Sequence, residues 1–112
     1  MESTRQKKIS RLLLKEMSEV FQREARDVTI GALVTVTVVR ISPDLGQAKV
    51  YLSIFPVDRA KEVHATITEH TSQLRFALGK RVGKQLRIIP ELRFFVDDTL
   101  DYVENIDRLL KE

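Results

Sequence analysis

The amino-acid sequence predicts an α+β fold in which helices pack on one face of a three-stranded sheet. Apolar residues recur at three- and four-residue steps near the start of the chain and again after Pro56, which is typical of amphipathic helices. Before Pro56 and after Pro90 the apolar residues alternate with polar ones and many are β-branched, which indicates half-buried strands. A chain of 112 residues has the size of one ordinary domain, so we expect residues 1–112 to form a single core.

The composition limits the chemistry that the chain can perform. It has no cysteine, which excludes disulfides, thiol catalysis and cysteine-based zinc sites and fits a reducing compartment. No apolar leader and no apolar run of roughly 20 residues is present, so we expect a soluble, cytoplasmic protein without a membrane span. The net charge of +3 and the pI near 9.4 favour a polyanionic partner, although ordinary solubility is the alternative.

The first helix is predicted from Thr4 to about Ala25. Its apolar stripe consists of Ile9, Leu12, Leu13, Met17, Val20 and Phe21. Cations gather on the opposite side of this helix, at Lys7, Lys8, Arg11 and Lys15. Such a basic face is either plain solvation or a surface for an anionic partner.

A β-hairpin follows the first helix. Charged and small residues from Glu24 to Gly31 end the helix, and residues 33–41 are rich in valine and threonine, as expected of a strand. Residues 42–46 have turn chemistry, and the second strand runs to Phe55 with its inward positions at Ala48, Val50, Leu52 and Ile54. Tyr51 and Phe55 point outward, where they either stack on bases or pack against protein.

Two more helical segments and a strand complete the predicted order. Asp58 can cap a helix that runs to about His70, and a kink or break is expected at His70, Thr71 and Ser72 because helix propensity is weak there. The helical stripe resumes at Leu74, Ala77, Leu78 and Val82. Residues 92–96 then alternate as a third strand, and Asp98 or Thr99 can cap a last helix, whose apolar residues are Val103, Ile106, Leu109 and Leu110.

This order of elements is that of the type II K-homology (KH) fold, an RNA-binding fold. KH domains usually clamp RNA with a G-x-x-G loop between the paired helices, where backbone N–H groups approach phosphates. The chain lacks that loop. The segment Gly79-Lys80-Arg81-Val82-Gly83 has one residue too many and lies in or at the end of a predicted helix, so its glycines either fray the helix end or form a phosphate cradle.

The segment from Arg75 to Arg93 is strongly basic, with Glu91 as its only carboxylate. Its cations are Arg75, Lys80, Arg81, Lys84, Arg87 and Arg93. Clustered cations bind phosphates and release counterions, which predicts salt-sensitive RNA binding. The alternatives are a solvated helix face and, for Arg93, an ion pair with a carboxylate on its sheet.

No set of residues converges in the way that catalysis needs, and we predict no enzyme activity, no cofactor and no metal. His64 and His70 are six residues apart and fall on different helix faces. An acidic run could in principle hold a hard cation or serve a small metal-dependent hydrolase: Asp97, Asp98, Asp101, Glu104 and Asp107. Complementing the dipole of the last helix is the simpler interpretation of these acids.

Three stretches resemble the ribosome-binding factor A family, which are bacterial assembly factors of the small ribosomal subunit. They are the helix from Arg11 to Glu24, the hairpin VTVVRISPDLGQAKVY at residues 36–51, and LRIIPELRF at residues 86–94. The resemblance implies a KH-like fold in which a helix kink, commonly Ala-x-Gly, replaces the G-x-x-G loop. Here the kink falls at His70-Thr71-Ser72.

The resemblance also implies the partners and the role of the chain. It implies binding to the free 30S subunit and to 16S rRNA near the decoding and neck region, and help in maturing the 5′ end of that RNA. It also implies importance in the cold and release assisted by a ribosome-associated GTPase. We further expect the chain to be a monomer. The alternative from the residues is a KH-like protein-interaction module that docks through its sheet face.

Overall fold

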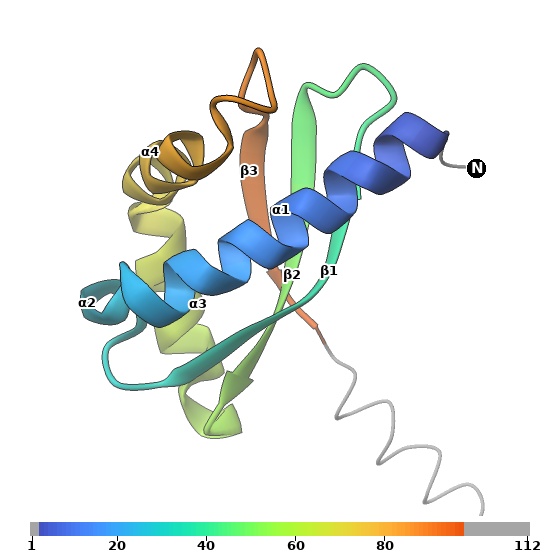
Figure 1. Cartoon of the computed structure of the whole chain (residues 1–112). Coiled ribbons are helices and arrows are strands. Elements are labelled where there is room, and N and C mark those ends of the chain that lie inside the picture. The colour runs from blue at the N-terminus through green and yellow to red at the C-terminus, as the bar shows by residue number, and fades with distance from the viewer. Residues whose placement is uncertain (1–2, 98–112) are drawn as a thin grey trace, which may run out of the picture.

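The computed structural model describes residues 3–97 of the chain (Figure 1). The elements are α1 (Thr4–Arg23), α2 (Arg26–Thr29), β1 (Leu33–Ile41), β2 (Gln47–Phe55), a short 3-10 turn η1 (Val57–Arg59), α3 (Ala60–Glu69), α4 (Thr71–Val82) and β3 (Glu91–Val96). The predicted last helix, with its cap at Asp98 or Thr99, lies outside the described residues.

The sheet has the strand order β1-β2-β3, with β1 and β2 antiparallel and β2 and β3 parallel. In Figure 1, α1 crosses the sheet, and α3 and α4 lie beside the α1 end that leads to α2. The inward residues of all three strands are buried against these helices, while the outward residues are mostly exposed. The predicted α+β class, with a KH-like three-stranded sheet and helices on one face, is confirmed.

The core forms where the helical stripes meet the inward side chains of the sheet. The stripes on α1, α3 and α4 are at most 1% exposed at Leu13, Met17, Val20, Val63, Ile67, Leu74, Leu78 and Val82. The rings of Phe21 and Phe94 meet edge to face with their centroids 6.0 Å apart, which joins the C-terminal part of α1 to β3. Burying each large apolar side chain contributes about 2 kcal/mol, so this contact fixes α1 across the sheet.

The start of α1 is fixed by a capping box. The Ser3 hydroxyl accepts a hydrogen bond from the Gln6 amide at 3.1 Å, and the Ser3 amide donates to Gln6 Oε1 at 2.8 Å. The nitrogen of the same side-chain amide, Gln6 Nε2, donates to the carbonyl oxygen of Ile41 at 3.1 Å in a buried site. Gln6 therefore both caps α1 and ties it to the end of β1.

Three local features differ from the prediction. The predicted break at residues 24–31 contains the four-residue helix α2, after which Ile30 and Gly31 adopt positive φ values of 45° and 82°. Strict alternation along residues 33–41 would bury Val38 together with Val34 and Val36, but the pairing register of β1 shifts between Val36 and Val38, so Val39 enters the core instead. Asp58 does not cap α3, because it lies inside the 3-10 turn, and Arg59, the residue before the helix, makes no side-chain cap.

Candidate RNA-binding surface

The junction between α3 and α4 is built around His70. α3 ends at Glu69 and α4 begins at Thr71, so the structure interrupts the helix at His70, while Thr71 and Ser72 belong to the first turn of α4. The imidazole Nδ1 of His70 lies 2.8 Å from the carbonyl oxygen of Thr66 and can donate to it. His70 therefore bonds within α3, and its role in the described structure is to complete that helix.

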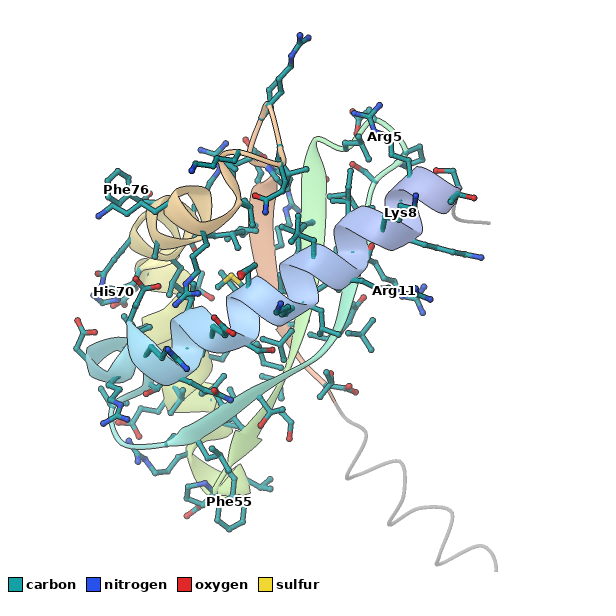
Figure 2. All side chains as sticks on the ribbon, viewed as in Figure 1. Arg5, Lys8, Arg11, Phe55, His70 and Phe76 are labelled. Atoms are coloured by element: carbon teal, nitrogen blue, oxygen red, sulfur yellow. The ribbon has the colours of Figure 1, made fainter. Side chains whose placement is uncertain are left out.

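Arg75, on α4, reaches the loop that leads to β3. Its Nε donates to the carbonyl oxygen of Pro90 at 3.1 Å, and its Nη2 donates to that of Ile89. Both acceptors are neutral, and Arg75 takes part in none of the ion pairs among residues 3–97, so the side chain is held in place without a carboxylate partner there. Figure 2 shows that the neighbouring Phe76 also points outward from α4, and its side chain is 67% exposed.

Phe76 carries a cation over its ring. The Lys80 ammonium lies 4.8 Å from the ring centroid, within the range of a cation–π contact. These side chains border an open hollow of about 500 Å³. It is lined by Ser72, Arg75, Phe76, Gly79, Lys80 and Ile89. The hollow thus combines an exposed aromatic ring with two cations, which is the composition that suits a nucleotide.

The loop after α4 brings Arg87 near the start of α1. Lys84 and Arg87 are exposed, and neither has an ion pair among residues 3–97. A groove of about 330 Å³ separates Arg87 and Ile88 from Arg5 and Ile9 of α1. Arg5 and Arg87 therefore line the same groove, together with the acidic Asp44 of the β1–β2 turn.

The four cations predicted on α1 are exposed along the helix: Lys7, Lys8, Arg11 and Lys15. Figure 2 shows Arg5 and Lys8 near the N-terminus, with Arg11 further along. The first turn of α1 holds no acidic residue, although carboxylates there would complement the helix dipole. Cations placed at the positive end of a helix lower its stability slightly, and they create a site that attracts anions.

Arg81 is in a different environment from the other cations of its segment. Its Nη1 donates to Glu19 at 2.6 Å and its Nε donates to Glu24 at 2.9 Å, while Glu16 lies 3.9 Å from Nη1. The hydrogen bond to Glu24, followed by the attraction of both carboxylates, raises the pKa of Arg81 above its ordinary value. Carboxylates from α1 and its C-terminal cap surround this side chain, which therefore joins α1 to α4.

The glycines of α4 do not form a phosphate cradle. Gly79 lies within the helix and packs against Ile89, where a Cβ would meet the Ile89 side chain at 3.5 Å. Gly83 follows the helix with φ of −58°, in the ordinary right-handed helical region. Neither glycine exposes the turn of amides that a KH clamp uses.

The histidines and acids give no sign of a catalytic or metal centre in the described part of the chain. His64 Nε2 lies 2.6 Å from the carbonyl oxygen of Phe94, a contact between α3 and β3. Residues 3–97 contain no group of three or more potential metal ligands. Of the acidic run, only Asp97 is described, and it accepts a hydrogen bond from the Thr37 hydroxyl at 2.6 Å.

No helix among residues 3–97 has both the length and the apolar character to cross a membrane.

The sequence interpretation missed Phe76, Arg5 and two outward cations of the sheet, Arg40 and Lys49. Phe76 lies off the stripe of Leu74 and Leu78, and an apolar residue outside a stripe is the signal that identifies it. Arg93 was expected to contact RNA or to pair with a carboxylate on its sheet. Its cross-strand partner is Lys49, and Arg93 takes part in none of the ion pairs among the described residues.

Comparisons with known proteins agree with this architecture. The family model described as ribosome-binding factor A matches residues 5–110. Ribosome-binding factor A from Cytophaga hutchinsonii is 46% identical over 112 residues, covering 100% of this chain and 84% of the relative. The corresponding protein of Flavobacterium johnsoniae is 44% identical over 111 residues, covering 98% of this chain and 85% of the relative.

Solved structures give the same fold. The crystal structure of ribosome-binding factor A from Thermus thermophilus superposes with a TM-score of 0.68 at 24% identity, over 81% of this chain and 94% of that one. A homology model of the Thermus thermophilus factor was fitted into a cryo-EM map of a 30S complex of that factor. It superposes with a TM-score of 0.62 at 25% identity, over 78% of this chain and 89% of that one. With its KH-like fold and a match over nearly its whole length, the chain belongs to the ribosome-binding factor A family.

Proposed function

We propose that this chain is a non-enzymatic factor that binds the small ribosomal subunit through 16S rRNA. The contacting cations are Lys7, Lys8, Arg11, Lys15, Arg75, Lys80, Lys84 and Arg87. Membership of the family supports the proposal, as does the Thermus thermophilus relative, which was fitted into a map of its 30S complex. Residues 1–112 act as one KH-like RNA-binding domain, which needs no cofactor or metal.

The observation that carries the proposal is the contrast between Arg81 and its neighbours. Arg81 is surrounded by carboxylates, whereas Lys80 and Lys84 have no carboxylate within ion-pair distance among residues 3–97. Cations that are held on a rigid helix without acidic partners repel one another, and a polyanion relieves this repulsion. Arg81 was predicted to touch RNA, and we now propose that it positions α4 instead.

The exposed Phe76 adds stacking to this electrostatic surface. An unpaired base that stacks on the ring places its phosphates near Arg75 and Lys80, which border the same hollow. Base stacking tolerates any sequence, because every base has a π face. The site therefore suits an unpaired segment of folded rRNA better than a continuous duplex.

The finer role that we propose is supported by the family resemblance. The chain acts on the free 30S subunit late in its maturation and assists processing of the 5′ end of 16S rRNA. It works as a cytoplasmic monomer, matters most in the cold, and leaves the subunit with the help of a ribosome-associated GTPase.

The test removes three exposed cations of the surface together. The variant Lys80→Ala, Lys84→Ala, Arg87→Ala should bind purified small subunits at least tenfold more weakly and flatten the salt dependence of binding, because fewer counterions are released. The matched control removes three exposed cations elsewhere, Arg23, Arg26 and Lys61, and should bind nearly as the parent does. If both triple variants weakened binding equally, the loss of affinity would follow from the lower net charge alone, and this would contradict the proposed surface.

A second candidate function is docking to a protein, through an apolar patch at the far end of the sheet. Leu33 and Phe55 are cross-strand partners on β1 and β2, and they are 65% and 63% exposed. Exposed apolar pairs of this kind suit a protein contact. Binding to small subunits that is insensitive to salt and is lost in Phe55→Ser would favour this candidate over RNA contact.

A further inference from the structure

The exposed face of the sheet carries three cations in one cross-strand row. Arg40 of β1 lies opposite Lys49 of β2, and Lys49 lies opposite Arg93 of β3. All three side chains are exposed. The row belongs to the face opposite the core, so it is separate from the cations of α1 and α4.

No acidic side chain forms an ion pair with this row within residues 3–97. None of Arg40, Lys49 and Arg93 takes part in the ion pairs found there. Like charges directly opposite each other on neighbouring strands destabilise a sheet. Their juxtaposition therefore costs stability, and an anion lying across the three strands would recover it.

A row of apolar and aromatic residues lies next to the cations on the same face. Because side chains on one face of a strand are two residues apart, Tyr51 follows Lys49 and Phe95 follows Arg93. Tyr51 and Phe95 are themselves partners, and their rings stack with centroids 5.4 Å apart and planes 26° apart. Phe95 is 38% exposed, and Val38 extends the row onto β1 with 37% exposure.

The two rows together match one kind of ligand. Phosphates need cations, bases need exposed aromatic surface, and single-stranded RNA presents both along one chain. An acidic peptide would satisfy the cations but would leave the stacked rings without a partner. On the other side of the cation row, the exposed Gln47 and Glu91 form the next cross-strand pair. The carboxylate of Glu91 would repel a phosphate placed there.

We propose that the outer sheet face is a second RNA-binding surface, on which Arg40, Lys49 and Arg93 hold the phosphates of a single strand and the Tyr51–Phe95 pair stacks with its bases. The identity of the anion as RNA rests on the proposed function. The surface itself rests on strand register and exposure. Because the helical surface lies on other elements, the chain can hold two RNA segments at once, which raises its overall affinity.

The test measures binding of the purified full chain to a labelled oligouridine of about 10 nucleotides, a length within the site size of single-strand binders. Because the helical surface is itself proposed to take unpaired RNA, the comparison is made in the background of Lys80→Ala, Lys84→Ala, Arg87→Ala. In that background, Arg40→Ala, Lys49→Ala, Arg93→Ala should weaken binding at least tenfold and lower the log–log salt slope by about 2. Phe95→Leu, which keeps an apolar side chain, should weaken oligouridine binding roughly fivefold or more and leave binding to an RNA duplex unchanged. An unaltered far-ultraviolet circular dichroism spectrum and a cooperative thermal unfolding transition establish that both variants fold.

The outcomes separate this inference from the proposed function. If the sheet variants bind oligouridine as the parent does, the sheet surface is wrong, even where the triple variant of Lys80, Lys84 and Arg87 has lost the small subunit. If the sheet variants lose oligouridine and the parent ignores small subunits, the proposed function fails and the sheet surface stands. Displacement of oligouridine by polyglutamate at equal charge concentration would identify an acidic protein as the ligand and overturn the inference.

Discussion

Arg81 and Glu19 form the shortest ion pair of the described structure, with 2.6 Å between Nη1 of the guanidinium and Oε2 of the carboxylate. The pair joins the C-terminal end of α4 to α1, 62 residues earlier in the chain. Arg81 thus holds two helices together. Its neighbours Lys80 and Lys84 take part in none of the ion pairs among residues 3–97.

The first prediction concerns this ion pair. Arg81→Gln should lower the free energy of unfolding by about 2 kcal/mol, because it removes two charge-assisted hydrogen bonds and leaves three carboxylates close together. Urea denaturation measures the change. Lys84→Gln is the matched control, and it should stay within about 0.5 kcal/mol of the parent. An Arg81→Gln protein as stable as this control would show that the pair contributes nothing.

The second prediction concerns the buried amide of Gln6. Gln6→Ala removes the side-chain half of the capping box and leaves the Ile41 carbonyl oxygen without its partner, so we expect a loss of about 2 kcal/mol. Gln22→Ala, at an exposed position of the same helix, should change little. Thermal unfolding followed by circular dichroism compares the two, and equal melting temperatures would contradict the prediction.

The third prediction concerns pH and the β1–β2 turn. The hydroxyl of Ser42 and then the amide of Gly46 donate to Asp44 and hold its pKa below the ordinary value of 3.8. The pKa of Asp44 is lower in the folded protein than in the unfolded chain. The stabilisation of the fold by ionised Asp44 is therefore complete above pH 3.8 and disappears as the pH falls through the folded-state pKa. Asp44→Asn should therefore be less stable than the parent near neutral pH, and the difference should shrink as the pH falls below 3.8. A difference that grows on acidification would contradict this sign.

The fourth prediction concerns Phe76. Phe76→Ala should leave the melting temperature nearly unchanged, because the ring is 67% exposed. Small-subunit binding should weaken roughly fivefold or more, as expected for the loss of one stacked base. Phe55→Ala is the control, since Phe55 is similarly exposed at the far end of the sheet and lies well away from α4 in Figure 2. If only the control weakens binding, the protein-contact alternative gains support.

The elements that depend on local pattern could be predicted from the sequence. The stripe of Leu13 and Met17 and the alternation of Val50 and Leu52 identify α1 and β2, because periodicity reports which face of an element is buried. The bulge after Val36 could not be predicted, since both Val38 and Val39 suit the core and the pairing with β2 decides between them. The short helix α2 likewise follows from its packing position and not from a repeating pattern.

Residues of the candidate site could be predicted from the sequence only where their position on a helix shows that they are exposed. Lys7 and Arg11 are exposed because they lie opposite a buried stripe, which the sequence displays. Arg81 has its carboxylate partners 57 and 62 residues away, so its sequence neighbours give no sign of them. The row of Arg40, Lys49 and Arg93 exists only through strand register, which no single segment specifies.

The salt dependence of small-subunit binding by the unmodified chain decides whether unpaired cations hold this protein on RNA. Purified small subunits are sedimented with the chain over a series of monovalent salt concentrations, and the bound fraction is measured. Contact by several unpaired cations predicts tight binding in dilute buffer and a steep linear fall of log affinity with log salt. Absence of binding at the lowest salt, or binding that salt leaves unchanged, would show that these cations do not hold the chain on the subunit.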